Sequence, residues 1–97
     1  MAASEETKVP ALDFNALVLS LGSSVIVHLG EAPDPTSGQK AAPNLPMAQQ
    51  SIDLLAMLQE KTRGNLTADE ARFLENILFD LRMLYLQVSQ GRVPSKP

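Results

Sequence analysis

The stretch that decides the fold is residues 60–70, which read Glu60-Lys61-Thr62-Arg63-Gly64-Asn65-Leu66-Thr67-Ala68-Asp69-Glu70. Gly64 is typical of a helix stop, and the cations of Lys61 and Arg63 suit the negative end of a helix. Thr67 and Glu70 have the spacing of a capping box, in which each side chain accepts a hydrogen bond from the other residue's backbone N–H. One helix therefore ends and another begins within a few residues, and so short a connection predicts an antiparallel αα-hairpin.

The hydrophobic pattern extends this hairpin in both directions and adds one earlier helix. Apolar residues at helical spacing predict helices over about residues 45–63 and 68–88. A preceding helix is predicted over about residues 14–29, because Asp13 is a good N-cap and Gly30 can take the left-handed conformation that ends a helix. The sequence thus predicts an all-α fold, an apolar N-terminal helix plus an αα-hairpin.

Outside these helices the composition changes. Residues 31–44 are rich in proline and glycine, which predicts a linker; it could be a flexible tether or a functional loop, and we favour the tether. Residues 1–12 and 89–97 are predicted to be disordered tails around a single domain at residues 13–88. No basic region precedes an apolar stretch at the N-terminus, so no secretory signal is expected.

The overall composition excludes several classes of protein. The chain has 97 residues, no Cys and one His, so a disulfide scaffold, a thiolate metal site and a His-rich metal cluster are excluded. Its 8 Lys and Arg against 11 Asp and Glu argue against nucleic acid as a partner. We predict no metal, no cofactor and a cytoplasmic location.

The predicted helices carry more apolar residues than one chain can bury. Burying one face needs roughly three apolar positions in seven, which leaves about eight side chains in excess. The excess predicts a homo-oligomer, with a dimeric helical bundle favoured. Small residues four apart in the first helix suggest a close helix contact across a two-fold axis; the alternative is that they accommodate the hairpin of the same chain. The predicted interface is Phe14, Ala16, Leu17, Ser20, Leu21, Ser24, Val27, Phe79, Met83 and Leu86.

Charged residues within the apolar pattern are predicted to have a structural role rather than a catalytic one. Asp53, Asp80 and Arg82 are predicted to form an ion pair, either between helices or between subunits. The turn residues Lys61, Arg63, Gly64, Asn65, Thr67 and Glu70 are predicted to shape the hairpin, with anion binding by the two cations as the alternative. The single imidazole, His28, has no nucleophile and acid at a recognisable spacing, so no catalytic residue is predicted.

Several stretches of the sequence form a recognisable pattern: Ile52-Asp53-Leu54-Leu55-Ala56-Met57-Leu58, Glu60-Lys61-Thr62-Arg63-Gly64-Asn65-Leu66-Thr67 and Leu81-Arg82-Met83. The apolar helix ending at Leu29-Gly30 belongs to the same pattern. With these features the chain resembles, over about residues 13–88, the bacterial family known as domain of unknown function 1844. The resemblance implies a small all-α bacterial protein and brings with it no activity, substrate or catalytic residue.

Three functional hypotheses follow. The first is a cytoplasmic, non-enzymatic homo-oligomer that serves as an interaction or regulatory module, with an unidentified protein as a further partner. The second is a membrane-surface accessory protein whose first helix inserts, although about 16 residues reach only ~24 Å, short of the hydrocarbon core. The third is a small-ligand binder or enzyme at a subunit interface that uses Asp53, Asp80, Arg82 and His28.

Overall fold

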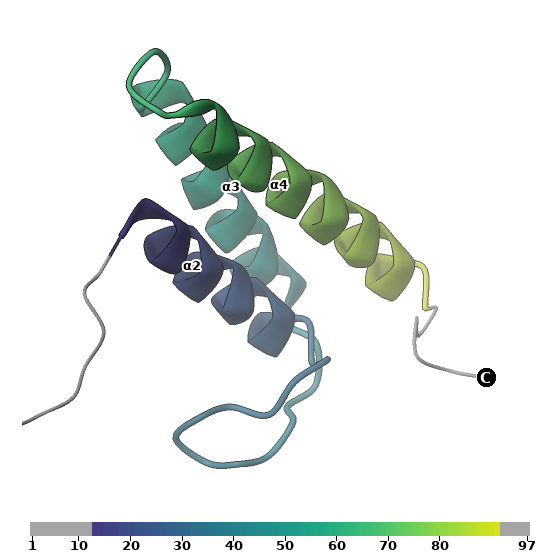
Figure 1. The fold of residues 1–97 in the computed structure, drawn as a ribbon. Coiled ribbons are helices and arrows are strands. Elements are labelled where there is room, and N and C mark those ends of the chain that lie inside the picture. Colours follow the sequence, from purple (N-terminus) through teal and green to yellow (C-terminus); the bar gives the residue numbers. More distant parts are fainter. Residues whose placement is uncertain (1–12, 92–97) are drawn as a thin grey trace, which may run out of the picture.

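A computed structural model describes residues 13–91, and within them it contains three α-helices and no strand. The helices are α2 (Phe14–His28), α3 (Leu45–Lys61) and α4 (Ala68–Ser89). The short turn between α3 and α4 forms the predicted hairpin, and α2 lies beside both, so that every pair of helices is in contact (Figure 1). The predicted all-α fold is confirmed.

Each helix begins where its capping residue predicts. The carboxylate of Asp13 accepts a hydrogen bond from the Ala16 N–H at 2.8 Å, and the side chain of Asn44 accepts one from the Met47 N–H at 3.2 Å. At the start of α4 the hydroxyl of Thr67 accepts from the Glu70 N–H at 3.1 Å. These bonds satisfy N–H groups that have no partner inside the helix, which is why the starts could be read from the sequence.

The helix ends differ slightly from the prediction. α3 ends at Lys61 rather than residue 63, because Thr62 leaves the helical conformation and its hydroxyl donates to the Leu58 carbonyl at 2.7 Å. Leu29 caps α2 instead of continuing it. α4 includes Ser89, so the predicted tail at 89–97 begins too early. The remainder of that tail from residue 92, and the predicted tail at 1–12, lie outside the described residues.

Residues 31–44 contain no helix, as expected, but they form a closed loop rather than an open tether. The Asn44 N–H donates to the His28 carbonyl at 2.7 Å, which joins the two ends of the loop. At its tip the Gly38 N–H donates to the Asp34 carbonyl at 2.7 Å. Gly30 has a φ of 78°, and a Cβ there would lie 2.6 Å from the Ala41 carbonyl oxygen. The loop is therefore packed onto the end of α2, which the preference for a tether did not anticipate.

The core lies where the three helices meet. All three helices and the C-cap of α2 contribute buried apolar residues to it: Val18, Val25, Leu29, Ala48, Ile52, Leu55, Leu74, Leu78 and Leu81. Gly22 is also buried, and a Cβ at this position would lie 3.5 Å from Ile77 and 3.6 Å from Leu81. Gly22 therefore lies on the face of α2 that packs against α4.

Candidate functional site

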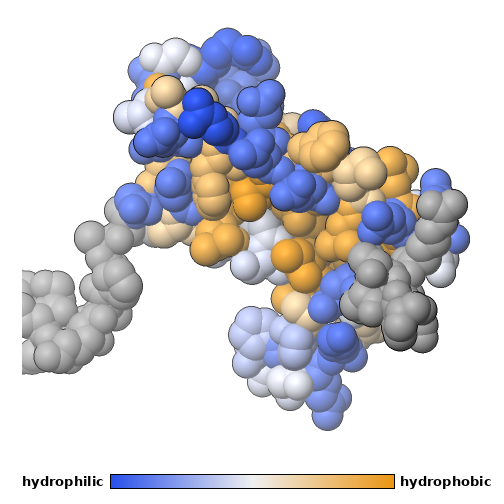
Figure 2. Space-filling model, turned by 45° about the vertical axis from the view of Figure 1, so that its right-hand side comes forward, coloured by the Kyte–Doolittle hydropathy of each residue, from blue (hydrophilic) through white to orange (hydrophobic). Residues whose placement is uncertain are grey.

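The most prominent feature of the surface is its exposed hydrophobic side chains. Within residues 13–91 eight large ones are exposed, in line with the excess expected from the helix composition: Leu17, Leu19, Met47, Leu54, Met57, Phe79, Met83 and Leu86. Figure 2 shows hydrophobic side chains, in orange, gathered across the middle of one face between more hydrophilic ends. Scattered apolar residues are ordinary on a protein surface, so their grouping matters more than their number.

One group forms a shallow groove between α2 and α3, which we call the α2–α3 groove. It has a volume of about 210 Å³ and is lined by Leu17, Leu21, Leu54, Met57, Leu58 and Lys61. Lys61 is the only charged residue of this lining, and all the other side chains are apolar. A concave surface of this composition fits an apolar side chain with a negative charge beside it.

A second group forms a convex stripe on α4, which we call the α4 ridge. It consists of Phe79, Met83 and Leu86, which lie one and two turns apart on the same side of the helix. Phe79 is 63% exposed, more than any other large hydrophobic side chain of residues 13–91. The ridge has the spacing of the contact face of a helix that packs against another helix.

The groove and the ridge lie on opposite sides of the core. The buried residues Leu74, Leu78 and Leu81 turn one face of α4 toward both α2 and α3. At 100° per residue, Phe79 and Met83 lie on the other side of α4, away from both helices, whereas Leu86 also borders a hollow that Gln49 and Ile52 of α3 line. The groove runs along the outer edge between α2 and α3. One chain therefore cannot place its own ridge in its own groove.

The small residues of α2 face outward. Ala16, Ser20 and Ser24 are exposed, so the alternative that they accommodate the hairpin of the same chain is wrong for them. Gly22 is the small residue of α2 that faces α4. The outward face of α2 thus carries short, uncharged side chains, as a helix contact requires.

The predicted interface residues are divided between two surfaces rather than forming one. Those on α2 are Phe14, Ala16, Leu17, Ser20, Leu21, Ser24 and Val27; Phe14, Leu21 and Val27 are half-buried and the others are exposed. Those on α4 make up the ridge. Reasoning from the sequence missed Leu54 and Met57 in the groove. The signal that could have found them is their position at the edge of the apolar stripe of α3, three residues apart.

Asp53 and Arg82 do not pair within the chain. The carboxylate of Asp53 accepts a hydrogen bond from the Gln49 side chain at 2.9 Å. The ion pairs among residues 13–91 are Arg63 with Glu60 at 2.7 Å and Arg72 with Asp69 at 3.7 Å. The predicted pairing between helices, including the one with Asp80, is therefore wrong. All three charged side chains are exposed to water, and none of them takes part in the ion pairs found among residues 13–91. Pairing between subunits stays a prediction.

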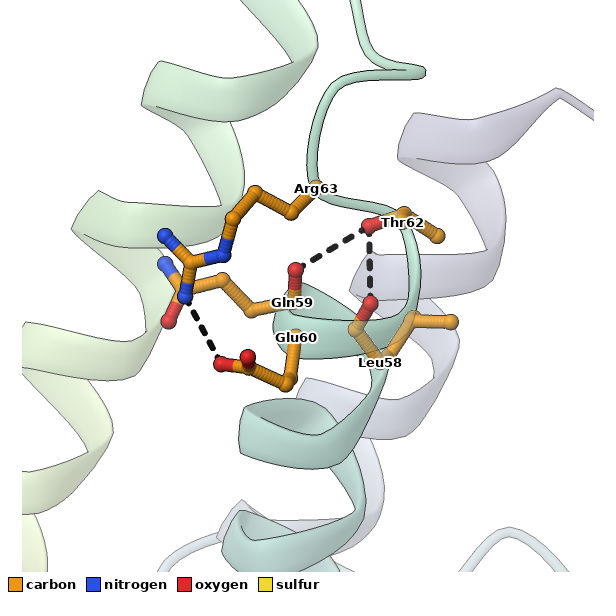
Figure 3. A network of polar contacts seen from close by, with 5 residues as sticks. All are labelled: Leu58, Gln59, Glu60, Thr62 and Arg63. Carbon is orange, nitrogen blue, oxygen red and sulfur yellow. Dashed lines mark hydrogen bonds and ion pairs between the residues drawn. The ribbon is translucent and has the colours of Figure 1, made fainter.

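Local hydrogen bonds and an ion pair hold the turn between α3 and α4. The Thr62 hydroxyl donates to the carbonyls of Leu58 and Gln59, and the guanidinium of Arg63 pairs with Glu60 (Figure 3). The Thr67 N–H donates to the Glu70 carboxylate at 2.9 Å, which completes the capping box. Arg63 and the start of α4 are therefore occupied by carboxylates, which works against the anion-binding alternative. Lys61 takes part in neither of the ion pairs found in residues 13–91.

A more polar hollow lies at the other end of α2. It has a volume of about 460 Å³, and its lining is Ser20, Ser23, Ser24, Val27, His28, Asp34 and Pro35. Hydrogen bonds from the Thr36 hydroxyl at 2.6 Å and the Thr36 N–H at 2.8 Å lower the pKa of Asp34. The loop brings Asp34 to this hollow, and no spacing in the sequence indicated it.

The four groups of the small-ligand hypothesis do not meet in one site. Arg82 lines a different hollow, of about 280 Å³, together with Gln49, Ile52, Tyr85 and Leu86. His28 lies with Asp34 at the end of α2. Among residues 13–91 no three metal-ligating side chains are grouped closely enough to hold an ion. In the same part of the chain, no helix combines the length and the apolar character that crossing a membrane requires.

The fold and surface define a small all-α protein with two separate apolar surfaces. A family model described as Domain of unknown function (DUF1844) matches residues 11–87. The chain therefore belongs to this family, in agreement with the resemblance seen in the turn sequence. Comparisons with curated proteins and with solved structures find no match.

Proposed function

We propose that this protein is a non-enzymatic homo-oligomeric module that acts by binding protein chains, first of all copies of itself. The observation that carries the proposal is the grouping of exposed apolar side chains into the α2–α3 groove and the α4 ridge. Grouped apolar surface is unfavourable in water and is common where proteins bind one another.

The energy available from these surfaces supports association. Leu17, Leu54 and Met57 in the groove and the three residues of the ridge are each between 37% and 63% exposed. Covering the exposed part of such a side chain contributes on the order of 1 kcal/mol, so the two surfaces together offer several kcal/mol. The loss of translational and rotational freedom on binding opposes this gain. The net association energy is therefore smaller than the gain itself, and we expect association that depends on concentration.

The proposal also includes a location, which is based on composition, and a further partner, which is based on the apolar surfaces. We place the module in the cytoplasm, and the lack of Cys in all 97 residues is consistent with a reducing compartment. A dimer is the smallest assembly that satisfies the proposal. A further protein partner would bind to whichever apolar surface the assembly leaves free.

Size-exclusion chromatography with light scattering tests the proposal. The mass of one chain is 10.5 kDa. We expect the measured mass to exceed this value at concentrations of about 10–100 micromolar and to fall on dilution, as a moderate association constant requires. A mass of one chain over the whole range would contradict the proposed self-association.

A further inference from the structure

We propose that the α4 ridge of one chain binds in the α2–α3 groove of a second copy, so that copies join head to tail. This inference rests on the proposed self-association and names the two surfaces that make it. The two surfaces differ in shape and in charge, and both differences favour contact between unlike surfaces.

The shapes are complementary. The ridge is convex, and Phe79 is the most exposed of the large hydrophobic side chains in residues 13–91. The groove is concave, has a volume of about 210 Å³, and is walled by leucines and Met57. A groove against a groove would leave an empty space, and a ridge against a ridge would leave the sides of Phe79 uncovered. A ridge in a groove covers both surfaces and also brings a methionine sulfur to an aromatic ring, a favourable contact.

The charges are complementary as well. Lys61 lines the groove and belongs to neither of the ion pairs found among residues 13–91. Glu75 lies one helical turn before Phe79 on α4, is exposed, and also belongs to neither pair. With Phe79 in the groove of the next copy, a carboxylate one turn away from the ring is available to the ammonium group of Lys61.

Pairing of the ridge with itself is disfavoured by its own charges. In an antiparallel pair of α4 helices related by a two-fold axis, a residue close to the axis lies near the same residue of the other copy. An axis through the middle of the ridge, near Met83, would bring the two Arg82 side chains together. Like charges placed opposite each other destabilise a contact, and the head-to-tail arrangement avoids this.

The opposite positions of the two surfaces determine how the assembly grows. Because the ridge and the groove lie on opposite sides of the core, each chain in the contact keeps one free ridge or one free groove. A contact of this kind continues into a ring or an open chain and does not stop at two copies. The inference therefore predicts masses above that of a dimer at high concentration.

A mixing experiment tests the inference directly. Phe79→Glu places a charge in the ridge, and Met57→Glu places one in the groove, so each change disrupts one of the two surfaces. Both positions are more than half exposed, so we expect both variants to fold. Each variant alone should remain a single chain, with an association constant lowered by roughly tenfold or more. An equimolar mixture should form a complex of two chains and nothing larger, because only one intact ridge and one intact groove can meet. Far-UV circular dichroism checks that both variants are folded.

Three results would overturn the inference, and only the first of them also contradicts the proposed function. If the wild-type chain remains a single chain, both proposals are wrong. If it self-associates and the mixture of variants does not, the contact is not between ridge and groove, and only the head-to-tail inference is wrong. A wild-type mass that stops at two copies has the same meaning. Leu19→Glu is the matched control, because Leu19 is 54% exposed but lies in neither surface; association should be unchanged in this variant.

A charge exchange tests the predicted contact between Lys61 and Glu75. Lys61→Glu and Glu75→Lys should each weaken association, and the chain that carries both changes should recover it. Lys61→Glu makes the net charge of −3 more negative and Glu75→Lys makes it less negative, so a general effect of net charge would act in opposite directions in the two variants. Weakening in both, with recovery in the double variant, therefore indicates a direct contact. Equal association in all four proteins would remove this contact from the inference.

Discussion

Replacement of Gly30 by alanine should destabilise the protein more than the same change at any exposed glycine with a similar backbone. Gly30 has a φ of 78°, a conformation that costs a residue with a side chain about 1–2 kcal/mol. In addition, the new Cβ would lie 2.6 Å from the Ala41 carbonyl oxygen and 3.3 Å from the Pro43 nitrogen. Both atoms belong to the backbone, so the loop itself must move, which we expect to cost a further 1–3 kcal/mol, roughly the penalty of overpacking.

Gly38 provides the matched control. Its φ is 73°, but a Cβ there would meet nothing within 4 Å. Gly38→Ala should therefore cost only the conformational penalty of about 1–2 kcal/mol. The difference between the two variants isolates the contact between Gly30 and the loop. Urea unfolding followed by circular dichroism measures it, and each kcal/mol should also lower the Tm by about 4–8 °C.

Equal losses in the two variants would refute this reasoning. They would mean that the loop moves away from Gly30 without cost, so that the bond between the Asn44 N–H and the His28 carbonyl does not hold the loop in place. The loop would then be the tether that its proline content suggested. A larger loss for Gly30→Ala would establish that the loop contributes to the stability of the folded chain.

Three further predictions concern a helix contact, a cap and a carboxyl group. Gly22→Ala should stabilise the protein by about 0.5–1 kcal/mol in urea unfolding, because its Cβ would make only ordinary contacts at 3.5 and 3.6 Å; destabilisation would mean that α2 and α4 pack more tightly than described. Thr67→Ala should cost about 1 kcal/mol, and Thr67→Ser much less, because serine can still accept the Glu70 N–H; similar losses would exclude the capping bond as the cause. NMR titration should find the pKa of Asp34 below that of an unfolded peptide, and Thr36→Val should raise it. Because the folded pKa is the lower one, any stability that this carboxylate contributes is present above its unfolded pKa and is lost as the pH falls through its folded pKa; an unchanged pKa in Thr36→Val would contradict this assignment.

The two proposed apolar surfaces were only partly visible in the sequence. The ridge residues Phe79, Met83 and Leu86 could be recognised because they lie at helical spacing opposite the buried stripe of α4. The groove could not, since it depends on which edges of α2 and α3 meet. Leu54 and Met57 look like an extension of the α3 core stripe until α2 is placed beside them. The hollow that contains His28 and Asp34 was likewise hidden, because a loop of variable path brings the two residues together.

The sequence by itself determined where the helices begin and that α3 and α4 form a hairpin. Those features depend on hydrogen bonds between residues three apart, such as Thr67 with Glu70. Bonds of this kind can be predicted from residues that are close together in the sequence. Only the tertiary structure decided which apolar residues are covered, how the loop closes on Gly30, and that groove and ridge face in opposite directions. These outcomes depend on how three helices share a limited core, and that choice involves residues far apart in the chain, on which periodicity within one helix carries no information.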